Sequence, residues 1–116
     1  MRESRRPLEI ETISIKNSLK PGQILVKIQR TGICGSQIGE IDAVKGEDRY
    51  LPHLLGHEAL GVVVDTGDSH KFSVDDHVIL HWIKGIGRNS DTPIYFSGSN
   101  KVNAGQITTF SEYAIV

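Results

Sequence analysis

The sequence predicts a mainly β fold, and three observations support this prediction. Valine and isoleucine together number 23 residues, against 12 for alanine and leucine, and β-branched side chains fit a pleated strand better than a helix. Several short stretches alternate apolar and polar residues, as a strand with one buried face does. Twelve glycines and four prolines supply the turns between them. A length of 116 residues corresponds to one domain, spanning residues 1–116.

The first half of the chain contains two predicted strands and one predicted helix. Residues 8–15 (LEIETISI) and 24–31 (ILVKIQRT) alternate as strands do, and the turn signal at residues 20–22 (KPG) predicts that they form a hairpin-like pair. Residues 34–41 lose this alternation, which predicts a short helix. Residues 43–53 are polar and irregular, and they predict a loop.

Three further strands are predicted in the second half. Residues 57–66 (HEALGVVVDT) and 76–82 (DHVILHW) are rich in apolar and β-branched residues, and residues 107–116 (ITTFSEYAIV) form the last predicted strand. Residues 84–106 contain four glycines, three asparagines and three serines. They predict a long surface excursion with one short strand at residues 94–96, and such long loops are often functional.

Composition excludes several classes of function. Thirteen basic residues face fourteen acidic ones, for a formal net charge of −1. A nucleic-acid module or an anionic-membrane module needs a clear excess of positive charge, so neither partner is expected. No apolar run approaches the roughly 20 residues of a membrane helix, and no apolar segment of a secretory signal follows the basic N-terminus. The single cysteine, Cys34, cannot form an internal disulfide, which favours a reducing, cytoplasmic location.

Cys34, His57 and Glu58 are the residues best suited to hold a metal ion. Cys34 lies between glycines, and His57 and Glu58 follow Gly56, where the backbone is free to bend. Thiolate, imidazole and carboxylate together suit zinc, and three ligands leave a fourth position open, as a catalytic zinc requires. The structural alternative stays open at this point, because a lone cysteine is most often a small buried apolar group. The neighbouring histidine and glutamate would then be an ordinary surface pair.

Several strings in this order resemble the zinc-dependent medium-chain alcohol dehydrogenase family. They are residues 21–22 (PG) before ILVKI, 32–36 (GICGS), 54–61 (LLGHEALG), 75–79 (DDHVI) and 109–113 (TFSEY). The resemblance runs from about residue 8 to the end of the chain. It implies the N-terminal part of the catalytic domain, a GroES-like, partly open β-barrel with one or two short helices. In that family a Rossmann domain comes next, and this chain contains none of it.

The resemblance also implies roles for individual residues. Cys34 and His57 match two ligands of the catalytic zinc. Glu58 matches the carboxylate beside the histidine, which is either an outer partner or an alternative ligand. Ser36 matches the hydroxyl that relays the proton of a small-molecule alcohol substrate. Zinc lowers the pKa of that alcohol, and NAD or NADP, held by the absent Rossmann domain, takes the hydride.

Four departures from the family pattern bear on function. Gln37 stands where the family has an aspartate that holds the histidine ligand; an amide can still accept from the imidazole, but it carries no charge. Residues 82–106 contain no cysteine, so a bound zinc would not be structural. The third zinc ligand of the family lies beyond residue 116, and the family's opening strand is missing or is replaced by residues 1–7. We therefore expect the isolated chain to bind zinc poorly and to catalyse nothing.

The sequence offers three candidate functions. The leading one is the catalytic-domain portion of a zinc-dependent, NAD(P)-linked alcohol or polyol dehydrogenase. The alternative is a stand-alone GroES-like binding or structural module without activity. A cysteine hydrolase using Cys34 and His57 is disfavoured, because no oxyanion hole or helix N-terminus beneath the thiol is evident. The chain ends on a strand, which predicts a fragment of a longer protein, and its uncovered packing face predicts a homo-oligomer.

Overall fold

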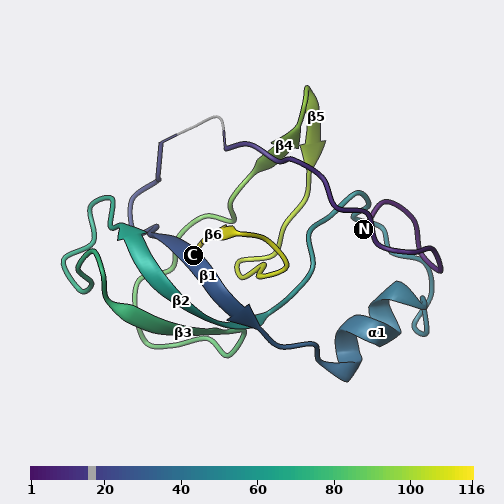
Figure 1. Cartoon of the computed structure of the whole chain (residues 1–116), viewed down its shortest axis with the longest axis horizontal. Coiled ribbons are helices and arrows are strands. Elements are labelled where there is room, and N and C mark those ends of the chain that lie inside the picture. The colour runs from purple at the N-terminus through teal and green to yellow at the C-terminus, as the bar shows by residue number, and fades with distance from the viewer. Residues whose placement is uncertain (16–17) are drawn as a thin grey trace.

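The computed structural model describes residues 1–15 and 18–116, and it is mainly β with one short helix (Figure 1). The elements follow in the order β1 (Leu25–Thr31), α1 (Gly35–Ile41), β2 (Glu58–Asp65), β3 (His77–His81), β4 (Tyr95–Ser97), β5 (Asn100–Val102) and β6 (Tyr113–Ile115). The predicted fold class is thereby confirmed. Among the described ranges, no helix has the length and apolar character needed to cross a membrane.

Four of the strands form one antiparallel sheet in the order β3-β2-β1-β6. Its buried side carries the core, where Val26 of β1 lies directly opposite Val63 of β2 and neither is exposed to solvent. Leu80 of β3 and Ala114 of β6 extend this core across the sheet. The strands β1 and β2 therefore form the buried centre of the sheet, and the segments that follow or precede them start from this packed core.

An irregularity in β1 changes the direction of its last residues. The pairing runs from Ile28↔Gly61 to Arg30↔Leu60, so Gln29 is an extra residue in β1. Such a bulge bends a strand and increases its twist. Beyond it, Thr31 lies opposite the buried Ala59, and its hydroxyl is 2.8 Å from that of Thr109. The bulge thus lies just before the segment that leads to Cys34.

The strands β4 and β5 form a separate hairpin within the predicted surface excursion, where only one short strand was expected. Tyr95 attaches this hairpin to the main sheet: its ring is buried, and its hydroxyl accepts a hydrogen bond from the Ile115 N–H at 3.0 Å. Burial raises the pKa of the Tyr95 phenol. The excursion is therefore partly packed against the core.

The predicted strand at residues 8–15 is wrong, and so is its pairing with residues 24–31. Of residues 8–15 only Ser14 makes a β-bridge, and its partner is Phe96 in β4. The reason is that both edges of β1 are already occupied, by β2 on one side and β6 on the other. The N-terminal segment instead crosses the molecule as an extended chain, held by the ion pair between Arg2 and Glu11.

Other predicted elements are confirmed with shifted ends. The strand predicted at residues 24–31 is β1, the helix at residues 34–41 is α1, and residues 57–66 and 76–82 contain β2 and β3. The strand predicted at residues 107–116 is shorter, since only Tyr113–Ile115 pair with β1. Residues before it turn back toward Leu55, whose carbonyl accepts from the backbone N–H groups of Thr109 and Phe110 at 3.1 and 3.0 Å.

Candidate functional site

Cys34 and His57 come together because the two paired strands β1 and β2 deliver them to the same end of the sheet. Cys34 follows the end of β1 and directly precedes α1, with its backbone extended (φ −85°, ψ 148°). His57 directly precedes β2, and the Gly32 N–H donates to the Glu58 carbonyl at 3.1 Å, which extends the strand pairing to this point. Both Cys34 and His57 are half-buried.

The surroundings of the Cys34 sulfur favour its thiolate form. Ser36, through its hydroxyl and backbone N–H, and the His57 ring lie close enough to the sulfur to stabilise its negative charge. Together they hold the pKa of the Cys34 thiol below its ordinary value, with Ser36 the largest contributor. The structure therefore places three of the four sequence-predicted site residues near one another: Cys34, Ser36 and His57.

Glu58 lies to one side of this group. Its side chain is exposed and packs over Gly32, where even a methyl group would clash with the carboxylate. Within the described part of the chain, Cys34, His57 and Glu58 do not form a group whose ligand atoms all lie within 4.8 Å of one another. Adjacent strand residues point to opposite faces, which explains why His57 reaches the sulfur and Glu58 does not.

The turn before His57 requires glycine. Gly56 has φ +91°, and a Cβ there would run into the Thr109 side chain and the Phe110 backbone. A residue with a side chain would be strained by its backbone angle and excluded by its neighbours. Gly56 therefore provides the bend that the sequence predicted between this segment and β2.

Gln37 supports the same turn. Its side chain is buried (6% exposed for the whole residue), and its carbonyl oxygen accepts a hydrogen bond from the Gly56 N–H. Its amide nitrogen donates to Glu40 at 3.0 Å. An imidazole was the expected donor to Gln37; in the structure the Gln37 carbonyl oxygen instead holds the backbone next to His57.

A second group of titratable side chains lies behind this turn and was not identified from the sequence. His53 is buried, its Nε2 contacts the Asp48 carboxylate, and a Glu40 oxygen lies 3.5 Å away. No sequence motif assigns His53 a role. No spacing rule connects residues 40, 48 and 53, because one lies on α1 and the others in an irregular loop.

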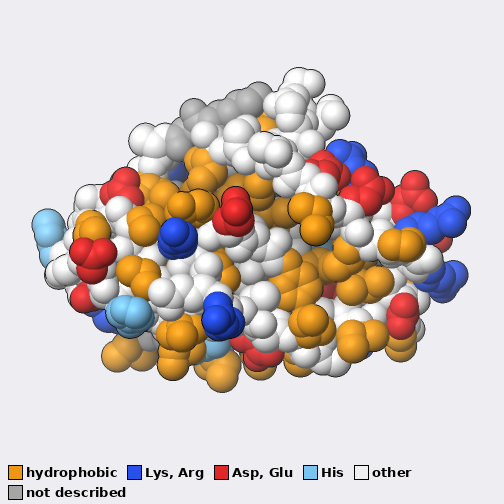
Figure 2. All heavy atoms as spheres, viewed as in Figure 1, with side chains coloured by type: hydrophobic (Ala, Val, Ile, Leu, Met, Phe, Trp, Pro, Cys, Tyr) orange, Lys and Arg blue, Asp and Glu red, His pale blue; other side chains and the backbone are white. Residues whose placement is uncertain are grey.

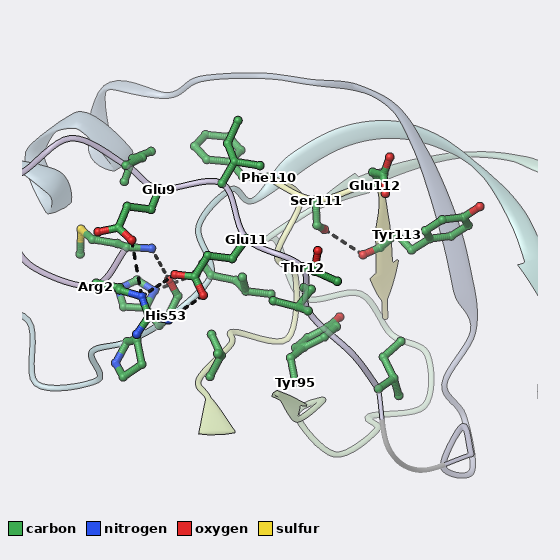
Figure 3. A pocket seen from close by; sticks show the side chains of 18 of the residues that line it. Arg2, Glu9, Glu11, Thr12, His53, Tyr95, Phe110, Ser111, Glu112 and Tyr113 are labelled. Carbon is green, nitrogen blue, oxygen red and sulfur yellow. Dashed lines mark hydrogen bonds and ion pairs between the residues drawn. The ribbon is translucent and has the colours of Figure 1, made fainter. Parts of the chain in front are cut away.

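A sizeable cavity lies elsewhere in the molecule. It measures about 780 Å³ and lies between the N-terminal segment and residues 110–113 (Figure 3). The Arg2–Glu11 ion pair and the buried Tyr95 lie in its wall, and His53 reaches it from the side. Cys34 and His57 do not line it, so the cavity and the sequence-predicted site are separate features.

Comparison with known proteins identifies the family. The family model described as "Alcohol dehydrogenase GroES-like domain" matches residues 20–116. The chain therefore belongs to this family, and the resemblance to the zinc-dependent medium-chain alcohol dehydrogenases is confirmed.

Individual relatives agree with that assignment. The chain is similar to the S-(hydroxymethyl)glutathione dehydrogenase of Photobacterium damsela subsp. piscicida, at 39% identity over 95% of this chain and 36% of the relative. It is also similar to the class-3 alcohol dehydrogenase of Cereibacter sphaeroides (36% identity; 66% of this chain, 20% of the relative). A D-arabinose 1-dehydrogenase (NADP(+)) of Saccharolobus solfataricus is 27% identical over 100% of this chain and 34% of the relative. The chain thus spans between a fifth and about a third of these relatives.

Proposed function

We propose that this chain is the catalytic-domain portion of a zinc-dependent, NAD(P)-linked alcohol or polyol dehydrogenase. The observation that carries the proposal is that the His57 ring, from a separate segment of the chain, lies near enough to Cys34 to lower the pKa of its thiol. Two ligand types that zinc prefers thus meet at one point. Family membership supports the same conclusion, since the relatives are named as dehydrogenases of alcohols, a hydroxymethyl adduct and a sugar.

The donor set fits a zinc ion. A metal needs the thiolate and the neutral imidazole, and the lowered pKa of the Cys34 thiol favours the first of these. Cys34 and His57 would hold the ion, and Glu58 would remain beside it unless its side chain turned inward. Two close protein ligands make a weak site, which agrees with our expectation that the isolated chain binds zinc poorly.

The remaining residues suit the handling of a proton. When bound, zinc supplies a Lewis acid that favours the deprotonated form of a substrate alcohol. Ser36 is exposed and adjacent to Cys34, so its hydroxyl can pass the alcohol proton toward solvent. The hydride goes to NAD or NADP, which a Rossmann domain outside this chain would hold. The substrate is then a small-molecule alcohol, and a cytoplasmic location suits the single unpaired cysteine.

Zinc titration of the chain tests the metal site. We expect Cys34→Ser and His57→Gln each to weaken zinc binding by more than the roughly 10–100-fold that loss of an outer hydrogen-bond partner costs. His70→Gln, at an exposed histidine, is the matched control and should change nothing. The proposal fails if all three variants bind the same number of zinc ions with the same affinities. Oxidation of an alcohol panel with NAD or NADP, by the longer polypeptide that contains this chain, tests the activity.

A non-catalytic GroES-like module is the second candidate. The observation that favours it is the position of Glu58, which leaves two close ligands rather than three within the described residues. A longer polypeptide that binds zinc but oxidises no alcohol would support this candidate against the first.

Self-association is a further part of the proposal. Apolar side chains are exposed at the sheet edge and just after it: Ile79 is 77% exposed, Trp82 70% and Ile83 61%. Figure 2 shows apolar side chains exposed over one face of the molecule, with charges of both signs between them. Exposed apolar surface drives association, so a homo-oligomer is proposed. Light scattering should show a mass above that of the monomer, reduced by Ile79→Lys; a monodisperse monomer contradicts the proposal.

A further inference from the structure

Three side chains outside the candidate zinc centre converge on one point. Glu40 comes from the end of α1, and Asp48 and His53 come from the loop between α1 and β2. One ligand atom from each lies within 4.8 Å of the other two. The side chains of Asp48 and His53 are almost buried, at 9% and 10% exposure, while Glu40 is 39% exposed. The cluster is therefore an enclosed group of nitrogen and oxygen donors that opens to solvent at Glu40.

Each of the three side chains is fixed through its other polar atom. His53 Nδ1 lies 2.7 Å from the Leu54 carbonyl, Asp48 Oδ1 accepts from the Tyr50 N–H at 2.7 Å, and Glu40 Oε2 accepts from Gln37 at 3.0 Å. These contacts leave His53 Nε2, Asp48 Oδ2 and Glu40 Oε1 directed at one another. Outer hydrogen bonds of this kind are what orients the ligands of a protein-bound metal.

The His53 ring needs a cation at this point. A carbonyl only accepts, so Nδ1 must carry the hydrogen that it shares with Leu54. In the neutral ring the lone pair of Nε2 would then face two carboxylates, and this arrangement is repulsive. Either a second proton or a metal ion relieves the repulsion. A histidine whose Nδ1–H donates to a backbone carbonyl and whose Nε2 is free is a common arrangement in metal sites.

We propose that Glu40, Asp48 and His53 form a second divalent-cation site, distinct from Cys34 and His57. One imidazole nitrogen and two carboxylate oxygens suit zinc or a neighbouring transition ion better than calcium or magnesium, which prefer oxygen alone. Water would complete the coordination on the exposed side, next to Glu40. The bound ion would join α1 to the loop before β2, and Gln37 would connect it to the Gly56 turn.

Zinc titration of the Cys34→Ser/His57→Gln variant tests this site alone, because the other candidate ligands are then absent. Zinc is expected to bind still, with calcium much weaker, and long-range proton–nitrogen NMR should show His53 Nε2 shifting while Nδ1 stays protonated. Adding Asp48→Asn should weaken zinc binding at least about tenfold. Glu47→Gln is the matched control, because Glu47 is an exposed carboxylate directly before Asp48, and it should have no effect.

Two results would overturn the proposal. The first is a His53 ring protonated at both nitrogens and unchanged by zinc, since the cation is then simply a proton shared with Asp48. The second is equal zinc affinity in the Asp48→Asn and Glu47→Gln backgrounds. If Asp48→Asn does not fold, Glu40→Gln at the more exposed ligand gives the same comparison. None of these outcomes depends on Cys34, so the dehydrogenase proposal can fail while this one stands.

Discussion

Two histidines four residues apart, His53 and His57, occupy opposite chemical environments. His57 is half-buried beside the sulfur of Cys34 and the hydroxyl of Ser36, whereas His53 is buried against two carboxylates. The positive φ of Gly56 turns the chain between them. One short segment thus places one imidazole near sulfur and another against carboxylate oxygens, because the backbone turns sharply between the two rings.

Gly56→Ala should have the largest effect, because it breaks the turn that separates the two histidines. The new Cβ would meet Thr109 and the Phe110 backbone at a residue with positive φ, and we expect a loss of about 3–5 kcal/mol in the free energy of unfolding. Gly46→Ala is the matched control, since Gly46 also has positive φ (101°) but no atom within 4 Å of its Cβ position. It should cost about 1–2 kcal/mol. Urea unfolding measures both, and equal losses would contradict the explanation.

Gln37→Leu should have the second largest effect, because Gln37 connects the two histidine environments. The change leaves the buried Gly56 N–H without its acceptor, which costs about 1–3 kcal/mol. Gln37→Glu keeps an acceptor for Gly56 but places a second negative charge beside Glu40. We therefore expect Gln37→Glu to be destabilised at neutral pH and to recover as the pH is lowered and the carboxylates are protonated. A pH-independent loss in chemical denaturation would argue against this.

Ser36→Ala should change the reactivity of Cys34 with little effect on stability. Ser36 is the largest cause of the lowered pKa of the thiol, so its removal should raise that pKa toward the ordinary value. The thiolate fraction at neutral pH then falls, and alkylation by iodoacetamide in metal-free protein slows. His57→Gln should shift the pH profile in the same direction by a smaller amount. A profile unchanged by Ser36→Ala would show that the hydroxyl does not act on the sulfur.

Glu11→Gln should have the smallest effect and should leave both histidines as they are. The Arg2 guanidinium holds the pKa of Glu11 below its ordinary value. A lowered folded-state pKa stabilises the fold above the unfolded-state pKa, and the contribution is lost as the pH falls through the folded-state pKa. The variant should therefore be slightly less stable at neutral pH and equal to the parent once Glu11 is protonated. Thermal unfolding across pH measures this, and a larger gap at low pH would contradict it.

Much of the sheet could be predicted from the sequence, because its strands carry local signals. Alternation and β-branched residues located β1, β2 and β3 within a residue or two, and the loss of alternation located α1. The same alternation wrongly predicted a strand at residues 8–15. A pattern reports which residues can face a core, but it does not report whether a neighbouring strand has a free edge.

The candidate site divides in the same way. Motif resemblance directed attention to Cys34, Ser36 and His57, and the structure places them together. The cluster around His53 carried no such signal, because its members are unevenly spaced and only the folded loop brings them into contact. The sequence also did not predict the role of Gln37. Its carbonyl oxygen accepts from the Gly56 N–H, and the position of that N–H depends on the turn at Gly56.

The extra residue at Gln29 has a consequence for how this chain tolerates change. Before Gln29, the even-numbered residues of β1, such as Val26, face the core. After Gln29, the odd-numbered Thr31 is on that face, opposite the buried Ala59. The inward-facing residues therefore change from even-numbered to odd-numbered between the first part of β1 and the part that leads to Cys34. Gln29 itself is exposed, so almost any amino acid should be accepted there. Deleting that one position would leave Ile28, Arg30 and Thr31 in regular alternation opposite their present partners, so the pairing should survive while the bend that directs the chain toward Cys34 is lost.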